Sequence, residues 1–145
     1  LNPTDAGQTS PSLTEFILFG DSVVVDGKYS PGSGCGAIDS ECREVYKLGG
    51  GITISKLKLC GGSGCNAAGE PHLNVVFNRP NPEAHFASNL ANLDASCPSP
   101  NGACSHATIT LLLARRSVAR NICVWSTGHI SVTTEFPVEG TEPLC

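Results

Sequence analysis

The chain has 145 residues, a length that fits a single domain (1–145) with room for a real hydrophobic core. Charged residues make up 15% of it, against roughly 25% in typical globular proteins, and the net charge is −4. This balance argues against nucleic acid as a partner, which needs a basic face, and no apolar stretch is long enough to span a membrane.

The first third of the chain predicts a loose arm, two short strands and one helix. Residues 1–13 are polar, include two prolines and predict a loose N-terminal arm. Residues 15–19 and 22–25 are rich in β-branched and aromatic side chains, which favours two strands. Residues 39–48 predict the helix, because acidic and hydroxyl side chains can cap its start, apolar residues recur at helical spacing and three glycines follow it.

The middle of the chain predicts two more strands and a long loop. Residues 52–60 alternate between apolar and polar side chains, with a change of parity that predicts a β-bulge near Ser55 and Lys56. Residues 72–79 predict another strand, which a proline ends. We expect residues 81–101 to form a loop, with a short helix over 87–94 as an open alternative.

The last third predicts three consecutive strands, over 106–114, 119–126 and 129–136, with a hairpin turn at 127–128. Arginines 115–116 then fall at a solvated hairpin tip. Along the last strand, one alternating set predicts a wet face and the other an inward face: His129, Ser131, Thr133 and Glu135 outward, and Ile130, Val132 and Phe136 inward. The elements together predict a mainly β fold, an antiparallel β-sandwich or small β-barrel with one short helix.

Cysteine content predicts that disulfides staple this fold. Eight cysteines, an even number, can form four bridges in an oxidising compartment, although the sequence does not choose among the pairings: Cys35, Cys42, Cys60, Cys65, Cys97, Cys104, Cys123 and Cys145. The chain begins at Leu1 and contains no Met. We therefore expect a secreted, extracellular protein in its mature form, with a signal peptide removed.

Three groups of residues are candidate sites. Cys60, Cys65 and His72 have a spacing that brings possible zinc ligands together, but the oxidising context favours disulfides, so we expect no metal and no cofactor. Trp125 alternates with Cys123, which predicts that its ring packs on a disulfide.

The third group is catalytic. Glu70 and His72 are two residues apart, so on a strand they would share a face as a carboxylate–imidazole pair, with Arg79 and His85 as nearby cation and second base. The order of elements resembles small secreted fungal ribonucleases in outline, which implies a hydrolase built on this group. No stretch matches the ribonuclease motif residue by residue, and Arg79 has the opposite strand parity to His72.

In mature length, predicted disulfides, low charge and Gly/Pro-rich loops, the chain resembles small secreted cysteine-rich fungal proteins, including effectors and elicitors. The resemblance implies a non-enzymatic binding protein whose partner is an extracellular host protein or a cell-wall polymer. A secreted hydrolase is the first alternative. The second is a protease inhibitor, in which the segment 97–104 would present a disulfide-tethered loop.

Overall fold

The computed structural model describes residues 14–19, 35, 37–39, 41–62, 64–66, 73–77, 83–87, 104–138 and 145. The described part is mainly β and its strands are antiparallel, as the sequence predicts. The predicted arm over 1–13, the predicted strand over 22–25 and most of the predicted loop over 81–101 lie outside the described residues. Among the described residues, no helix is long and apolar enough to cross a membrane.

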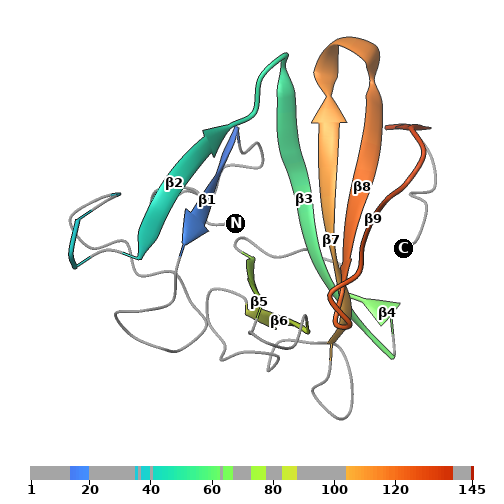
Figure 1. Ribbon diagram of the computed structural model, residues 1–145. Helices are drawn as coiled ribbons and strands as arrows, with labels where there is room; N and C mark the ends of the chain where they lie inside the picture. The colour runs from blue at the N-terminus through green and yellow to red at the C-terminus, as the bar shows by residue number, and fades with distance from the viewer. Residues whose placement is uncertain are drawn as a thin grey trace.

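A main sheet organises the structure (Figure 1). Its centre consists of three long antiparallel strands, β3 (Ile52–Gly61), β7 (Cys104–Leu113) and β8 (Val118–Trp125). Short strands extend its two edges: β4 (Gly64–Cys65) pairs with β3, while β9 (Ile130–Val132) and β10 (Phe136–Pro137) pair with β8.

Two small antiparallel ribbons accompany the main sheet. β1 (Glu15–Phe19) pairs with β2 (Cys42–Lys47), and this ribbon leans away from β3, to which it is joined at one end (Figure 1). β5 (Asn74–Phe77) pairs with β6 (Ala84–Ala87) near the opposite end of the sheet. The described strands do not close into a barrel.

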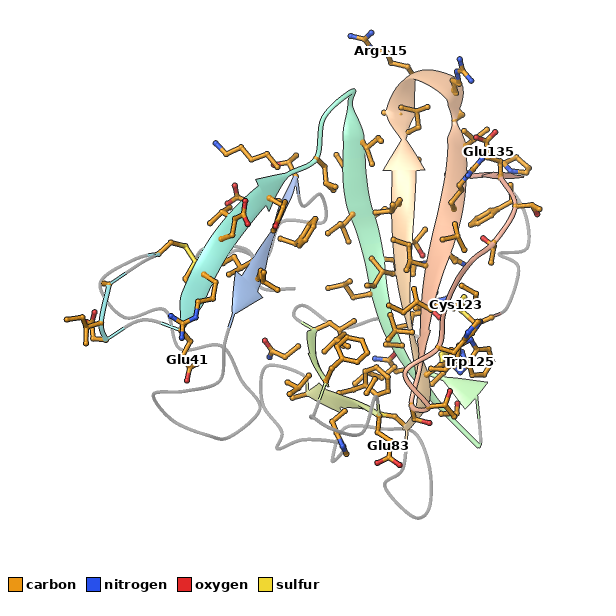
Figure 2. All side chains as sticks on the ribbon, viewed as in Figure 1. Glu41, Glu83, Arg115, Cys123, Trp125 and Glu135 are labelled. Carbon is orange, nitrogen blue, oxygen red and sulfur yellow. A yellow bond between two sulfur atoms is a disulfide. The ribbon has the colours of Figure 1, made fainter. Side chains whose placement is uncertain are left out.

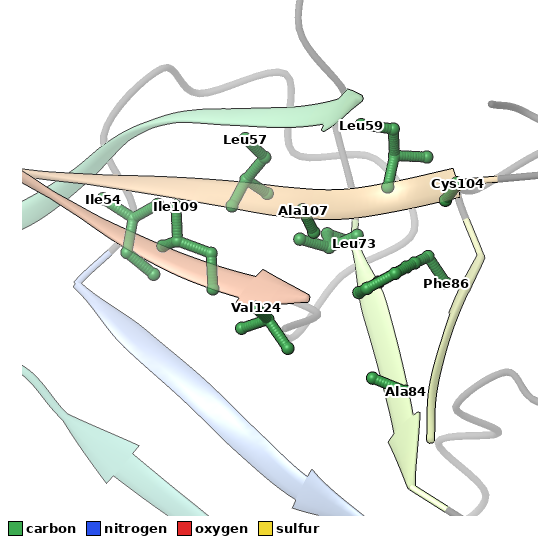
Figure 3. Close-up of a cluster of buried hydrophobic side chains, with 10 residues drawn as sticks. All are labelled: Ile54, Leu57, Leu59, Leu73, Ala84, Phe86, Cys104, Ala107, Ile109 and Val124. Atoms are coloured by element: carbon green, nitrogen blue, oxygen red, sulfur yellow. The ribbon is translucent and has the colours of Figure 1, made fainter. Parts of the chain in front are cut away.

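The core lies on one face of the main sheet, which we call the front face (Figure 3). The β5–β6 region covers its lower part with Leu73, Ala84 and Phe86, and Phe86 is only 1% exposed. The buried cluster comprises Ile54, Leu57, Leu59, Leu73, Ala84, Phe86, Cys104, Ala107, Ile109 and Val124. The opposite, back face carries His106, Thr108, Thr110 and Trp125, because side chains alternate along β7 and β8.

The predicted helix over 39–48 is wrong: Cys42–Lys47 is strand β2. A helix of this length is marginal by itself, so tertiary contacts decide its conformation. Here Tyr46 pairs with Phe16 across the ribbon, their rings stacked with centroids 5.0 Å apart, and Cys42 is bonded to Cys35. These cross-strand contacts outweigh the helical spacing of the apolar residues.

The predicted loop over 81–101 is also wrong at Ala84–Ala87, which is strand β6, and the strand predicted over 72–79 is observed at Asn74–Phe77. Alanine has low strand propensity and the neighbouring prolines suggest a loop, so the local sequence conceals β6. Pairing with β5 and the burial of Phe86 stabilise it instead.

Several local predictions on the main sheet are confirmed. The bulge lies at Ser55, where pairing passes from Ile54 to Lys56 along β3. The turn after β8 is closed by Gly128, whose N–H donates to the Trp125 carbonyl at 2.8 Å and whose φ is +82°. Arginines 115–116 are exposed in the 3-10 turn Ala114–Arg116 at the tip of the β7–β8 hairpin.

The last predicted strand, over 129–136, is divided into β9 and β10, and the predicted inward burial of Ile130 and Val132 is wrong. They pair with Val124 and Ile122 and therefore share the front face with them. Yet Ile130 is 54% and Val132 56% exposed, because β9 is an edge strand.

Disulfides staple the ends of the sheet and the first ribbon. The bonds are Cys35–Cys42, Cys60–Cys65 and Cys123–Cys145, and Cys104 is also disulfide-bonded. Cys97 lies outside the described residues. Cys60–Cys65 closes the short β3–β4 hairpin, whereas Cys123–Cys145 ties the C-terminal residue to the back of β8.

Candidate functional site

Of the predicted catalytic group, the structure describes only His85. Glu70, His72 and Arg79 lie outside the described residues. His85 is half-buried on β6, where it pairs with Val76 of β5. Of the predicted inhibitor loop over 97–104, only Cys104 is described, at the start of β7. The hydrolase and the inhibitor therefore stay predictions.

The sequence grouped Cys60 and Cys65 with His72, which lies outside the described residues. The histidine that the structure describes beside the two cysteines is His106. Cys60 is the cross-strand partner of His106, and the two sulfurs and a ring nitrogen of His106 lie within 4.8 Å of one another. The sulfurs are joined in a disulfide. His106 is far from this pair in sequence, so only the register between β3 and β7 could have identified it.

Trp125 lies on the same face of β8 as Cys123, and Figure 2 labels both side chains. The ring contact that the structure records is with His106, at a centroid distance of 4.7 Å and an interplanar angle of 37°. Partial burial lowers the pKa of His106 below its ordinary value of 6.5, because a charged imidazolium is poorly solvated there.

Buried polar groups continue along the back face above this aromatic pair. The Thr110 hydroxyl donates to Asn121 Oδ1 at 2.8 Å, and the Asn121 backbone N–H donates to Thr133 Oγ1 at 2.9 Å. Thr108 Oγ1 lies 3.1 Å from Cys145 Sγ. These groups satisfy one another across β7, β8 and the segment that follows β9, which is the arrangement of a structural network rather than of a reactive centre.

A hollow opens on the front face between the β1–β2 ribbon and the main sheet. Its volume is about 200 Å³, and every residue that lines it is apolar: Phe16, Leu48, Ile54, Ile109, Leu111 and Ile122. Because β5 and β6 cover only the lower part of the front face, the upper part of the same apolar surface borders this hollow.

A second hollow of about 260 Å³ adjoins the first, since both are lined by Leu111. Its lining comprises Ile52, Leu111, Leu112, Leu113, Val118, Ala119, Arg120 and Glu135. An ion pair lies at its edge, with Arg120 Nη2 3.0 Å from Glu135 Oε1 (Figure 2 labels Glu135). We call the two hollows together the apolar groove.

An aromatic pair flanks the groove on the ribbon side. Phe16 lines the first hollow, and the ring of Tyr46 stacks on it while remaining 40% exposed. The Tyr46 hydroxyl donates to the Glu44 carboxylate at 2.6 Å, and this hydrogen bond raises the pKa of Tyr46 above 10.0. The sequence places most of the lining residues in predicted strands, but it could not show that this face of the sheet is incompletely covered.

Comparison with protein-family models, with curated proteins and with solved structures finds no match to this chain.

Proposed function

We propose that this is a secreted, effector- or elicitor-like binding protein that acts outside the cell on a host protein. The apolar groove on the front face carries the proposal. It is an exposed, preformed apolar surface on a disulfide-stapled sheet. For the whole chain we propose a β-sandwich architecture, in which β5 and β6 begin the second layer.

Each hollow of the groove, taken alone, is smaller than a typical site for a drug-sized ligand. Sites for drug-sized ligands and cofactors are about 300–1,000 Å³, whereas a dry cavity of about 150 Å³ accommodates one benzene ring. The hollows, at about 200 and 260 Å³, therefore each fit one apolar side chain. Two anchor side chains from a neighbouring protein surface would fill both.

The lining favours a protein partner over a cell-wall polymer. A polysaccharide presents hydroxyl groups that need hydrogen-bonding partners, and the first hollow has none in its lining. Protein interfaces instead combine an apolar centre with a polar rim, and Tyr and Arg are enriched in them relative to the rest of the protein surface. Tyr46 and Arg120 occupy such rim positions here.

The stapled scaffold supports the same function. Side chains and loops that become ordered on binding cost about 0.5–1.5 kcal/mol each, so a groove that is already fixed loses less affinity. Ile54 and Ile109 line the first hollow and are 2% and 6% exposed, so the sheet's own core holds its floor in place.

The proposal is tested with peptides selected by display on the immobilised, disulfide-intact protein. We expect the selected peptides to share aromatic or aliphatic anchors. Ile122→Ser should weaken them about tenfold or more, since loss of a central apolar contact at an interface typically exceeds 1 kcal/mol. The matched control is Ile130→Ser, a front-face isoleucine that lines neither hollow and should leave the affinity unchanged.

Near-ultraviolet circular dichroism on both variants establishes that each remains folded. If Ile122→Ser and Ile130→Ser bind the peptides equally well, or if the peptides carry no apolar anchor, the groove is not the binding site.

A further inference from the structure

We propose that the Cys60–Cys65 disulfide conceals a zinc-binding site, which His106 completes when the disulfide is reduced. The inference rests on the back face of the sheet and is independent of the apolar groove. Cysteine thiolates and a histidine nitrogen are the ligands that Zn²⁺ prefers. Among the described residues, these three are the group whose ligand atoms converge, within 4.8 Å of one another.

Strand register places the three residues in one row across the sheet. Cys65 of β4 is the cross-strand partner of Cys60 of β3, Cys60 is the partner of His106 of β7, and His106 is the partner of Trp125 of β8. Directly paired side chains lie on the same face, with Cβ atoms about 4.5–5.5 Å apart. The convergence is therefore a property of the sheet and not of the disulfide alone.

Hydrogen bonds hold the two cysteines together without the sulfur–sulfur bond. The Asn66 N–H donates to the Leu59 carbonyl at 3.0 Å, and the Leu59 N–H donates to Asn66 Oδ1 at 2.9 Å. These bonds close the β3–β4 hairpin just beyond the cysteine pair. After reduction, the thiols of Cys60 and Cys65 remain adjacent.

A second hydrogen-bond chain sets the tautomer of His106. Ser105 Oγ lies 3.1 Å from the Cys60 carbonyl oxygen, which can only accept, so the single hydroxyl proton of Ser105 is donated there. Ser105 Oγ also lies 2.9 Å from His106 Nδ1 and must accept from it. Nδ1 therefore carries the proton and Nε2 the lone pair, with the ring further oriented by Trp125. Metal-binding histidines are commonly oriented by such a bond to the other nitrogen.

Among the three disulfides whose two cysteines are both described, this one is expected to contribute least to the stability of the fold, so its reduction costs the fold least. Its cysteines are 5 residues apart, compared with 7 for Cys35–Cys42 and 22 for Cys123–Cys145. A shorter closed loop constrains the unfolded chain less, so the bond stabilises the fold less. Cys65 is half-exposed, which gives a reductant access to one sulfur.

A dithiol can reduce the Cys60–Cys65 disulfide and so open the site. The dithiol transfers two electrons and two protons to the Cys60–Cys65 bond and itself becomes a disulfide. Zn²⁺ then displaces the two thiol protons and binds both thiolates and the neutral imidazole of His106. A water molecule can complete the tetrahedral set.

The experiment uses the whole protein, reduced with limiting dithiothreitol and freed of excess reagent under argon. Alkylation and peptide mapping identify which cysteines are open. Co²⁺ is added as a spectroscopic probe, and Zn²⁺ is added to compete with it. We expect one metal per chain, a thiolate-to-cobalt charge-transfer band, and protection of Cys60 and Cys65 from alkylation.

Three variants separate this site from adventitious thiol binding. His106→Ala should lower the affinity for the metal at least tenfold. Ser105→Ala should lower this affinity by a smaller factor, because the imidazole ring loses a bond that orients it. The matched control is His129→Ala, which removes an exposed histidine from the turn between β8 and β9 and should leave metal binding unchanged. Equal metal affinity and equal alkylation protection in His106→Ala and His129→Ala would overturn the proposal, and so would unfolding of the reduced chain without metal-dependent recovery.

Discussion

The bulge in β3 makes a sharp prediction about deletions. Ser55 has no cross-strand partner on β7, because the register passes from Ile54–Leu111 directly to Lys56–Thr110. Deleting Ser55 therefore joins two segments that are already in register. Every side chain beyond it keeps its face, so Leu57 still points into the core.

Deleting Lys58 from the same strand should have the opposite effect, because the side-chain period of a strand is two. Leu59, which is fully buried, would move to the back face, and Cys60 would take its place in the core. Regularising the bulge at Ser55 cannot rescue this deletion, since it would place Lys56 at the core position of Leu57.

The two costs differ by several kcal/mol. The Ser55 deletion removes a 3.3 Å hydrogen bond from Ser55 Oγ to the Thr110 carbonyl, worth about 0.5–1.5 kcal/mol. The Lys58 deletion removes Leu59 from the core, which lowers the free energy of unfolding by about 2–5 kcal/mol. It also misaligns the Cys60–Cys65 disulfide, whose short loop contributes about 2 kcal/mol of stability. Together these approach the whole stability of a typical domain, about 5–15 kcal/mol.

The assay is urea unfolding of both deletion variants, with the disulfides verified by mass spectrometry. We expect the Ser55 deletion to keep a cooperative transition with an unchanged m-value and to lose no more than about 1.5 kcal/mol. The Lys58 deletion should be unfolded or lack a cooperative transition. Similar stability losses in the two variants would refute the register and the parity argument built on it.

Two further predictions concern the back face. Asn121→Leu should lower the free energy of unfolding by about 1–3 kcal/mol, because it leaves the buried Thr110 hydroxyl without its acceptor. Adding Thr110→Val should recover part of this loss, which a double-mutant cycle measured by urea unfolding would show. NMR titration should give His106 a pKa below 6.5. Because this pKa is lower in the folded state, the unfolded state binds the proton first as the pH falls. The free energy of unfolding should therefore decrease as the pH drops through 6.5 and level off below the folded pKa. Trp125→Ala should move that pKa back upward, and an unchanged value would show that the tryptophan does not desolvate the ring.

The sequence predicted those parts of the fold whose information is local. Alternation along β3 identified both the strand and its bulge, and a glycine identified the turn at Gly128. The helix over 39–48 failed because the conformation of that segment depends on Phe16 and Cys35, which lie outside it. Strand β6 was missed for the same reason, since its stability comes from β5 and the core.

The candidate sites were harder to predict because they depend on which strands are neighbours. Nothing local to His106 connects it with Cys60, although the two are cross-strand partners. Most groove residues fall in strands that the sequence predicted, but the exposure of the upper front face depends on how far β5 and β6 extend over it. Local sequence patterns predict on which face of a strand a side chain lies. The tertiary arrangement decides which other residues cover that face.

Strand parity also separates the two proposals. Leu59 points to the front face and Cys60 to the back face, so the core beneath the groove and the sulfur–histidine row lie on opposite sides of one sheet. Substitutions at distant sites without shared partners usually act additively. Ile122→Ser should therefore leave metal binding by the reduced protein intact, and His106→Ala should leave peptide binding intact. If either variant lost both peptide binding and metal binding, the substitution would have disturbed the sheet itself. The groove is therefore supported only if Ile122→Ser loses peptide binding and keeps metal binding, and the metal site only if His106→Ala shows the reverse.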